Sequence, residues 1–121
     1  MDNWIRMGSP DITSIEADSV HKQIISGWIS QGPKTKEFEE KVSKYLSASN
    51  STCMSNGTVT LHSMLKTLDV CSGDYVVVPS LTYISSVNVI YECNATPIYC
   101  DVDPETLLID YNQLDLSLIH I

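Results

Sequence analysis

Gly73-Asp74-Tyr75-Val76-Val77-Val78-Pro79-Ser80-Leu81-Thr82-Tyr83 is the stretch that decides the fold. Three consecutive valines between a Gly-Asp turn and a proline predict a strand that is buried on both faces, as in a parallel sheet covered by helices. Residues 80–83 would then lie at the carboxyl end of that strand. In α/β sheets this is the end at which ligands bind.

Helical and strand-like patterns alternate on both sides of this strand. Apolar residues at helical spacing predict a helix from Val59 to about Leu68, and a weak strand is expected before it, over Thr52–Met54. Residues 85–93 read as another helix and residues 97–101 as another strand. The alternation predicts an α/β fold with a mostly parallel sheet.

Two helices are expected ahead of the alternating region. Thr13 and Glu16 have the spacing of a capping box, which opens a helix that runs to about Ser26. Its apolar side is expected to pack on a core, and consists of Ile15, Val20, Ile24 and Ile25. Residues 34–46 form a charged helix with a solvated Lys/Glu face. The stripe expected to be buried in this second helix consists of Phe38, Val42, Tyr45 and Leu46.

Composition excludes several classes of protein. The chain has 121 residues, 43% of them hydrophobic and 18% charged, which is typical of a globular domain. Its net charge of -8 argues against nucleic acid as a partner, because phosphate backbones attract Lys/Arg-rich surfaces. No apolar run is long enough to cross a membrane, and residues 1–4 do not begin a signal peptide. A cytoplasmic protein without membrane or nucleic-acid partners is therefore expected.

Neither the cysteines nor the acidic residues predict a metal site. The four cysteines are irregularly spaced without a Cys-x-x-Cys pair, so reduced and mostly buried thiols are expected; they are Cys53, Cys71, Cys93 and Cys100. Asp101 and Asp103 are followed by Pro104-Glu105, which favours a capped turn over metal ligation.

Ser55-Asn56-Gly57-Thr58 is a small-polar turn at the start of an expected helix. The unpaired amides of Gly57, Thr58 and Val59, together with the helix dipole and the Thr58 hydroxyl, would suit a phosphate group. Gly57 would allow close approach because it has no Cβ. The alternative is an ordinary capped helix with Ser55 or Asn56 as the cap.

Two aromatic residues are further candidates for a site. Tyr83, after the valine strand, could stack on a bound pyridine or purine ring, although a core or interface tyrosine is the alternative. Gly27 and Trp28 belong to a loop over residues 27–33 with two glycines and a proline, a composition typical of functional loops. A tryptophan that only anchors the loop is the alternative there.

The order of the motifs resembles one family over residues 5–114. These motifs are Ser9-Pro10-Asp11-Ile12; Ser26-Gly27-Trp28-Ile29-Ser30-Gln31-Gly32-Pro33; Glu37-Phe38-Glu39; Ser55-Asn56-Gly57-Thr58 with Leu61-His62; Gly73-Asp74 with Val78-Pro79-Ser80-Leu81-Thr82-Tyr83; and Ala95-Thr96-Pro97 with Asp101-Val102-Asp103-Pro104-Glu105-Thr106. Together they resemble the N-terminal part of the nucleotide-sugar aminotransferases of the DegT/StrS type, which are pyridoxal 5'-phosphate (PLP) enzymes of fold type I.

The resemblance implies a cofactor, a fold and a reaction. Gly57, Thr58 and Val59 would hold the PLP phosphate, Tyr83 would stack on its pyridine ring, and the loop around Gly27 and Trp28 would lie near the substrate entrance. The fold would be part of a large three-layer α/β/α domain. The full-length parent would work as a homodimer, transferring an amino group from an amino acid, usually glutamate, to a nucleotide-linked keto-sugar.

The resemblance also implies what the chain lacks. The Schiff-base lysine and the aspartate that pairs with the pyridine nitrogen would lie beyond this stretch, so catalytic residues are not expected here, and the chain alone should be inactive. Residues 1–33 are expected to form an arm, helix and active-site loop, residues 34–115 a partial PLP-binding domain, and residues 116–121 a non-native tail.

The resemblance implies that this chain alone would leave strand edges unpaired, so the isolated chain should be unstable. A cooperative thermal transition of a soluble monomer would refute this. Two other functions stay open at this stage. They are a PLP- or PMP-dependent sugar dehydratase on the same scaffold and a non-catalytic phosphate-binding module.

Overall fold

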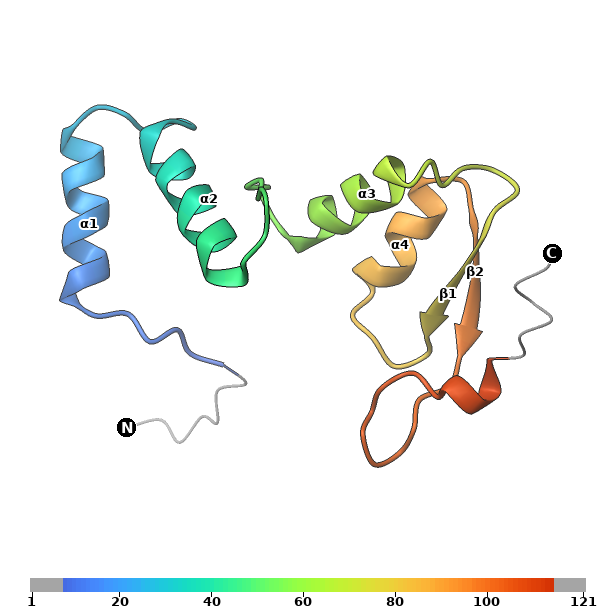
Figure 1. The fold of residues 1–121 in the computed structure, drawn as a ribbon. Coiled ribbons are helices and arrows are strands. Elements are labelled where there is room, and N and C mark those ends of the chain that lie inside the picture. Colours follow the sequence, from blue (N-terminus) through green and yellow to red (C-terminus); the bar gives the residue numbers. More distant parts are fainter. Residues whose placement is uncertain (1–7, 115–121) are drawn as a thin grey trace. The chain divides into compact units, whose positions relative to one another are not determined.

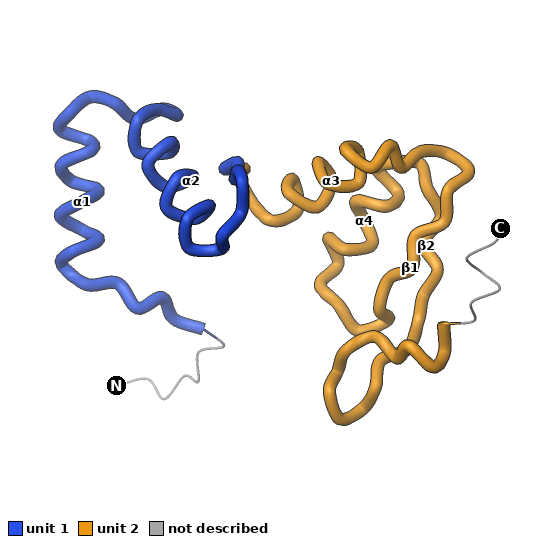
Figure 2. The backbone as a smooth tube through the Cα atoms, in the orientation of Figure 1, with its two compact units in different colours: residues 1–53 blue, residues 54–121 orange. Residues whose placement is uncertain are grey.

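The computed structural model describes residues 8–114. It divides into two compact units, residues 1–53 and residues 54–121, shown in different colours in Figure 2. Each unit is described by itself. The tail expected over residues 116–121 lies outside the described residues. None of the described helices is long and apolar enough to cross a membrane.

The first unit contains two helices, α1 (Ser14–Ile25) and α2 (Pro33–Leu46). The predicted capping box is present, because Thr13 caps α1 and its backbone N–H donates to Glu16 Oε2 at 2.8 Å. Pro33 occupies the first turn of α2, where its missing N–H costs no hydrogen bond. Both helices therefore begin where local sequence signals place them.

The predicted burial of these two helices is wrong for this chain. All four apolar residues of α1 are exposed, from 59% at Val20 to 73% at Ile25, and in α2 only Val42 of the expected stripe is half-buried. The patterns are amphipathic, but the described chain offers no core for these faces to cover. An amphipathic pattern reports which side of a helix can be buried, and burial also requires a partner surface.

The second unit is a small α/β structure (Figure 1). Its elements are α3 (Gly57–Thr67), β1 (Tyr75–Pro79), α4 (Ser85–Glu92), β2 (Thr96–Cys100) and the short 3-10 helix η1 (Tyr111–Gln113). The strands β1 and β2 pair in parallel, with Tyr75 opposite Thr96 and Pro79 opposite Cys100. The expected alternation and parallel pairing are confirmed, and α3 begins two residues earlier than predicted.

Only one face of this sheet is covered. Val78 packs with Val87, Ile90, Cys93 and Ala95 in a core beneath α4. On the other face, Tyr75 is 51% exposed and Val77 is 40% exposed. The expectation that β1 is buried on both faces is therefore wrong here, because the described part of the unit has no second layer of helices.

The weak strand expected over Thr52–Met54 does not form. The backbone N–H of Cys53 donates instead to Glu39 Oε1 of α2 at 2.7 Å, and the Ser51 hydroxyl donates to the Glu39 carbonyl at 2.6 Å. A strand needs a neighbour to pair with, and within the described residues this segment has none.

The cysteines follow the prediction in part. All four are free thiols; Cys93 and Cys100 are buried and Cys53 is half-buried, but Cys71 is exposed. The neighbouring Asp74 carboxylate raises the pKa of the Cys71 thiol, because a nearby negative charge disfavours the thiolate.

Candidate functional site

The first turn of α3 combines a cap with free amides. Asn56 is the N-cap, and its Oδ1 accepts a hydrogen bond from the Val59 N–H at 3.0 Å. Gly57 and Thr58 follow the cap, and their amides have no hydrogen-bond partner among the described residues. A Cβ built on Gly57 would meet nothing within 4 Å. The turn therefore offers two unpaired donors beside open space.

The structure agrees in part with both interpretations of this turn, the capped helix and the anion site. The helix is capped by Asn56, as the structural alternative expected, and the cap occupies the amide of Val59. The amides of Gly57 and Thr58 remain at the positive end of the helix dipole, where an anion is favoured. Val59 could donate to a ligand only if the Asn56 side chain turned away.

Tyr83 lies in the loop between β1 and α4. Its side chain is 76% exposed, so it is not a core residue. The loop leaves the carboxyl end of β1, and the chain after α3 leads into the amino end of β1 (Figure 1). No hydrogen bond joins Tyr83 to the first turn of α3 among the described residues.

A hydrogen bond that the sequence did not reveal joins the ends of the two strands. The Ser80 hydroxyl donates to Asp101 Oδ1 at 2.9 Å, across 21 residues of sequence. It fixes the loop that carries Tyr83 against β2. The rule that parallel strands end at one edge of a sheet could have suggested this pair.

The acidic stretch after β2 forms the predicted capped turn. Asp103 Oδ1 accepts hydrogen bonds from the backbone N–H groups of Glu105 and Thr106 and from the Thr106 hydroxyl. These donors stabilise the carboxylate and lower the pKa of Asp103. Oδ1 of Asp103 is therefore fully engaged within the turn itself.

Gly27 and Trp28 lie in a turn of the first unit that side-chain hydrogen bonds hold in place. Gly27 has a φ of 77°, a left-handed conformation that favours glycine. The Trp28 indole N–H donates to the Gln31 carbonyl at 3.3 Å, and the Gln23 side chain donates to the Trp28 carbonyl at 2.6 Å. Trp28 anchors the loop, as the structural alternative expected, while its side chain stays half-exposed.

Gly32 is required by this turn, and its replacement gives a prediction. A Cβ at Gly32 would overlap Nε1 of Trp28. We expect Gly32→Ala to displace the indole and destabilise the turn by about 1–3 kcal/mol, as overpacking does. In a Trp4→Phe background, where Trp28 is the one tryptophan of the chain, the emission maximum should shift to the red as the ring enters water. Gly8→Ala, where a Cβ would meet nothing within 4 Å, is the matched control. An unshifted emission maximum in Gly32→Ala would contradict the prediction.

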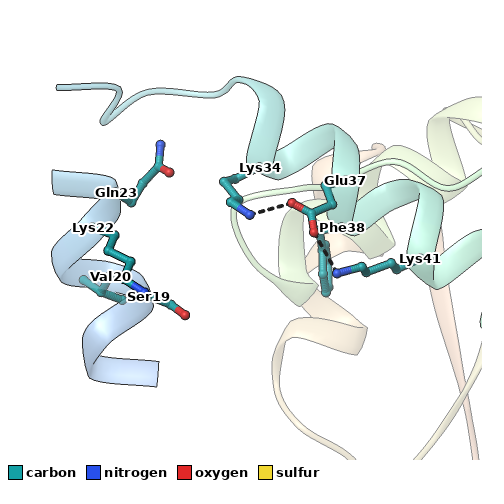
Figure 3. Close-up of a pocket in the computed structure, with 8 residues that line it drawn as sticks. All are labelled: Ser19, Val20, Lys22, Gln23, Lys34, Glu37, Phe38 and Lys41. Atoms are coloured by element: carbon teal, nitrogen blue, oxygen red, sulfur yellow. Dashed lines mark hydrogen bonds and ion pairs between the residues drawn. The ribbon is translucent and has the colours of Figure 1, made fainter. Parts of the chain in front are cut away.

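A groove of about 670 Å³ lies between α1 and α2 (Figure 3). It is lined by Ser19, Val20, Lys22, Gln23, Lys34, Glu37, Phe38 and Lys41. Lys34 and Lys41 both pair with Glu37, at 2.6 and 2.7 Å, and lower its pKa to about 2. The side chains are largely exposed, so these pairs contribute little to stability. None of the predicted site residues lines this groove.

Every lysine among the described residues is exposed. α4 brings Glu92 Oε2 to 3.6 Å from Nδ1 of His62. The two residues are 30 positions apart, beyond the reach of local spacing.

Comparison with known proteins gives a consistent result. A family model described as the DegT/DnrJ/EryC1/StrS aminotransferase family matches residues 10–117. The chain is 39% identical over 116 residues to a GDP-perosamine synthase of Escherichia coli O157:H7, covering 95% of this chain and 32% of that protein. It is 36% identical over 101 residues to a UDP-4-amino-4-deoxy-L-arabinose–oxoglutarate aminotransferase of Shewanella sediminis, covering 84% of this chain and 26% of that protein.

A solved structure agrees with the sequence comparisons. The PLP form of a protein from Streptococcus pneumoniae described as a sugar aminotransferase superimposes with a TM-score of 0.85 at 40% identity, covering 91% of this chain and 28% of that one. The chain thus spans about a third of the length of the proteins it matches.

Proposed function

Because the chain belongs to the DegT/DnrJ/EryC1/StrS aminotransferase family, we propose that it forms the phosphate-binding part of a PLP-dependent nucleotide-sugar aminotransferase. The observation that carries the proposal is the first turn of α3, with two unpaired amides beside open space. The full-length protein would transfer an amino group from an amino acid, such as glutamate, to a nucleotide-linked keto-sugar. Relatives whose names describe nucleotide-sugar amination support this substrate class.

The residues present fit the phosphate end of the cofactor. The Gly57 and Thr58 amides and the Thr58 hydroxyl would donate to the phosphate, Gly57 would let it approach, and the exposed ring of Tyr83 would stack on the pyridine. Bound PLP supplies an electron sink for the amino-transfer chemistry. This chain would hold and orient the cofactor, and Gly27 and Trp28 would belong to the substrate entrance.

Three further features belong to this proposal. The full-length protein would be a homodimer, it would act in the cytoplasm, and it would need neither nucleic acid nor a membrane as a partner. The net charge of -8 supports the exclusion of nucleic acid. The described helices have exposed apolar faces, and such faces are typical of surfaces that a protein partner covers.

A chimera tests the proposal. In it, this chain replaces the matched stretch of the Escherichia coli GDP-perosamine synthase, so that the synthase supplies the remaining two thirds. We expect the chimera to retain PLP, seen as a visible absorbance band that borohydride removes, and to perform the reaction of the synthase. A chimera that is soluble and helical by circular dichroism but retains no PLP would contradict the proposal.

Tyr83 gives a graded prediction in the same chimera. An aromatic stacking contact is worth about 0.5–1.5 kcal/mol beyond its buried area, so Tyr83→Ala should weaken PLP binding by roughly two- to tenfold. Tyr83→Phe keeps the ring and should bind PLP like the unmodified chimera. Equal losses in the two variants would show that the hydroxyl, and not the ring, matters.

A further inference from the structure

The loop that carries Tyr83 is joined to the end of β2 by its first residue, Ser80. The Ser80 backbone N–H donates to the Cys100 carbonyl at 2.8 Å, and its hydroxyl donates to Asp101 Oδ1 at 2.9 Å. The first bond continues the pairing of the two strands. The second is made by side chains beyond the end of β2, and its acceptor is a carboxylate, which binds a donor more strongly than a neutral oxygen does.

Asp101 is itself fixed by the chain that follows it. Its carbonyl accepts a hydrogen bond from the Asp110 N–H at 2.9 Å, and Val102 and Ile109 form an antiparallel bridge beside it. The chain between these residues makes a closed excursion at the carboxyl ends of β1 and β2 (Figure 1). Because Asp101 lies at the base of this excursion, its carboxylate is a fixed acceptor for the Ser80 hydroxyl.

The position of the Tyr83 ring depends on the backbone that carries it. Its side chain is 76% exposed and makes no hydrogen bond within residues 8–114. The Thr82 and Ser86 hydroxyls, 3.0 Å apart, form a bond that is local to the start of α4. The Ser80–Asp101 bond is therefore the side-chain contact that holds this loop to a different strand.

We propose that Asp101 is a positioning residue of the cofactor site. By accepting from the Ser80 hydroxyl, its carboxylate holds the loop where the Tyr83 ring would stack on the pyridine. Asp101 acts through Tyr83 and not by contact with the cofactor. The inference rests on the proposed function, because Tyr83 has a ring to stack on only if PLP binds beside it.

Titration of the apo chimera with PLP tests this role in two backgrounds. Asp101→Ala removes the acceptor and should weaken PLP binding by roughly two- to tenfold, the range expected for Tyr83→Ala. In a Tyr83→Ala background the same substitution should have almost no further effect, because no ring is left to position. Equal losses in the two backgrounds, or no loss in the presence of Tyr83, would overturn the proposal.

Three further variants identify the bond responsible. Ser80→Ala removes the donor and should match Asp101→Ala, whereas Asp101→Asn keeps an acceptor oxygen and should recover the lost affinity. Glu105→Ala is the matched control, since it removes an exposed carboxylate of the same excursion that accepts no hydrogen bond among the described residues. It should bind PLP like the unmodified chimera. A loss as large as that in Asp101→Ala would assign the effect to charge and overturn the proposal.

Amide hydrogen exchange in the apo chimera separates this inference from the proposed function. Asp101→Ala should speed exchange over residues 80–86, read by mass spectrometry of the peptides, by roughly twofold or more. Ser80→Ala gives the same measurement if Asp101→Ala fails to fold. Unchanged exchange would overturn the positioning role whether or not PLP binds. Faster exchange in a chimera that binds no PLP would sustain the role of Asp101 in holding the loop and contradict the proposed function.

Discussion

Gly57→Val is expected to remove most PLP binding from the chimera while leaving its stability nearly unchanged. A Cβ at Gly57 meets nothing in the chain itself, so the added side chain would fill only the space in which the phosphate would lie. Hydrogen bonds to a charged group contribute about 1.5–3 kcal/mol each, so loss of both amide contacts should weaken PLP binding by roughly a hundredfold to ten-thousandfold. Equilibrium titration of the apo chimera with PLP measures the loss.

Asn56→Ala is the control, because it removes the cap without filling the space beside Gly57. Loss of an N-cap costs about 0.5–2 kcal/mol of stability, and it leaves the Val59 amide free in addition to those of Gly57 and Thr58. We expect lower stability with PLP binding preserved. If Gly57→Val instead left PLP binding intact, the turn would be only a capped helix.

Ile90→Ala is expected to unfold the small sheet of the second unit. Ile90 is 2% exposed and packs in the core with Val78 and Cys93. Truncation of a buried isoleucine costs about 2–5 kcal/mol, a large share of the stability of so small a core. Measured in the chimera, hydrogen exchange at Val76 and Val78, whose amides face β2, should lose its protection.

Leu68→Ala is the matched control for this substitution. Leu68 is 74% exposed, so its truncation leaves the core intact and protection at Val76 and Val78 should persist. Retained protection in Ile90→Ala would show that this cluster is not the core of the unit.

Local signals in the sequence predicted the elements well. The capping box at Thr13, the proline at the start of α2 and the valine run of β1 each act within a few residues, so they can be read without knowing the rest of the molecule. Parallel pairing of β1 with β2 followed from the helix between them, since such a connection returns the chain in the same direction.

Burial and pairing could not be predicted in the same way, because they depend on partners. The apolar side of α1, the open face of β1 and the segment Thr52–Met54 carry patterns suited to contacts that the described residues do not provide. The Ser80–Asp101 and His62–Glu92 contacts join residues 21 and 30 positions apart, which only the folded chain brings together.

For the candidate site, the sequence identified the turn but not which of its amides the cap would pair and which would stay unpaired. Asn56 was one of two possible caps, and only the structure shows that its side chain takes the Val59 amide and leaves those of Gly57 and Thr58 unpaired.

The most direct test asks whether the first turn of α3 binds the cofactor phosphate. The apo chimera is titrated with pyridoxamine phosphate and with pyridoxamine, two ligands that differ only in the phosphate and form no Schiff base with lysine. We expect the phosphate form to bind at least tenfold more tightly, and Gly57→Val to abolish most of that difference. Equal affinity for the two ligands, or a difference that survives Gly57→Val, would show that the phosphate does not bind at this turn.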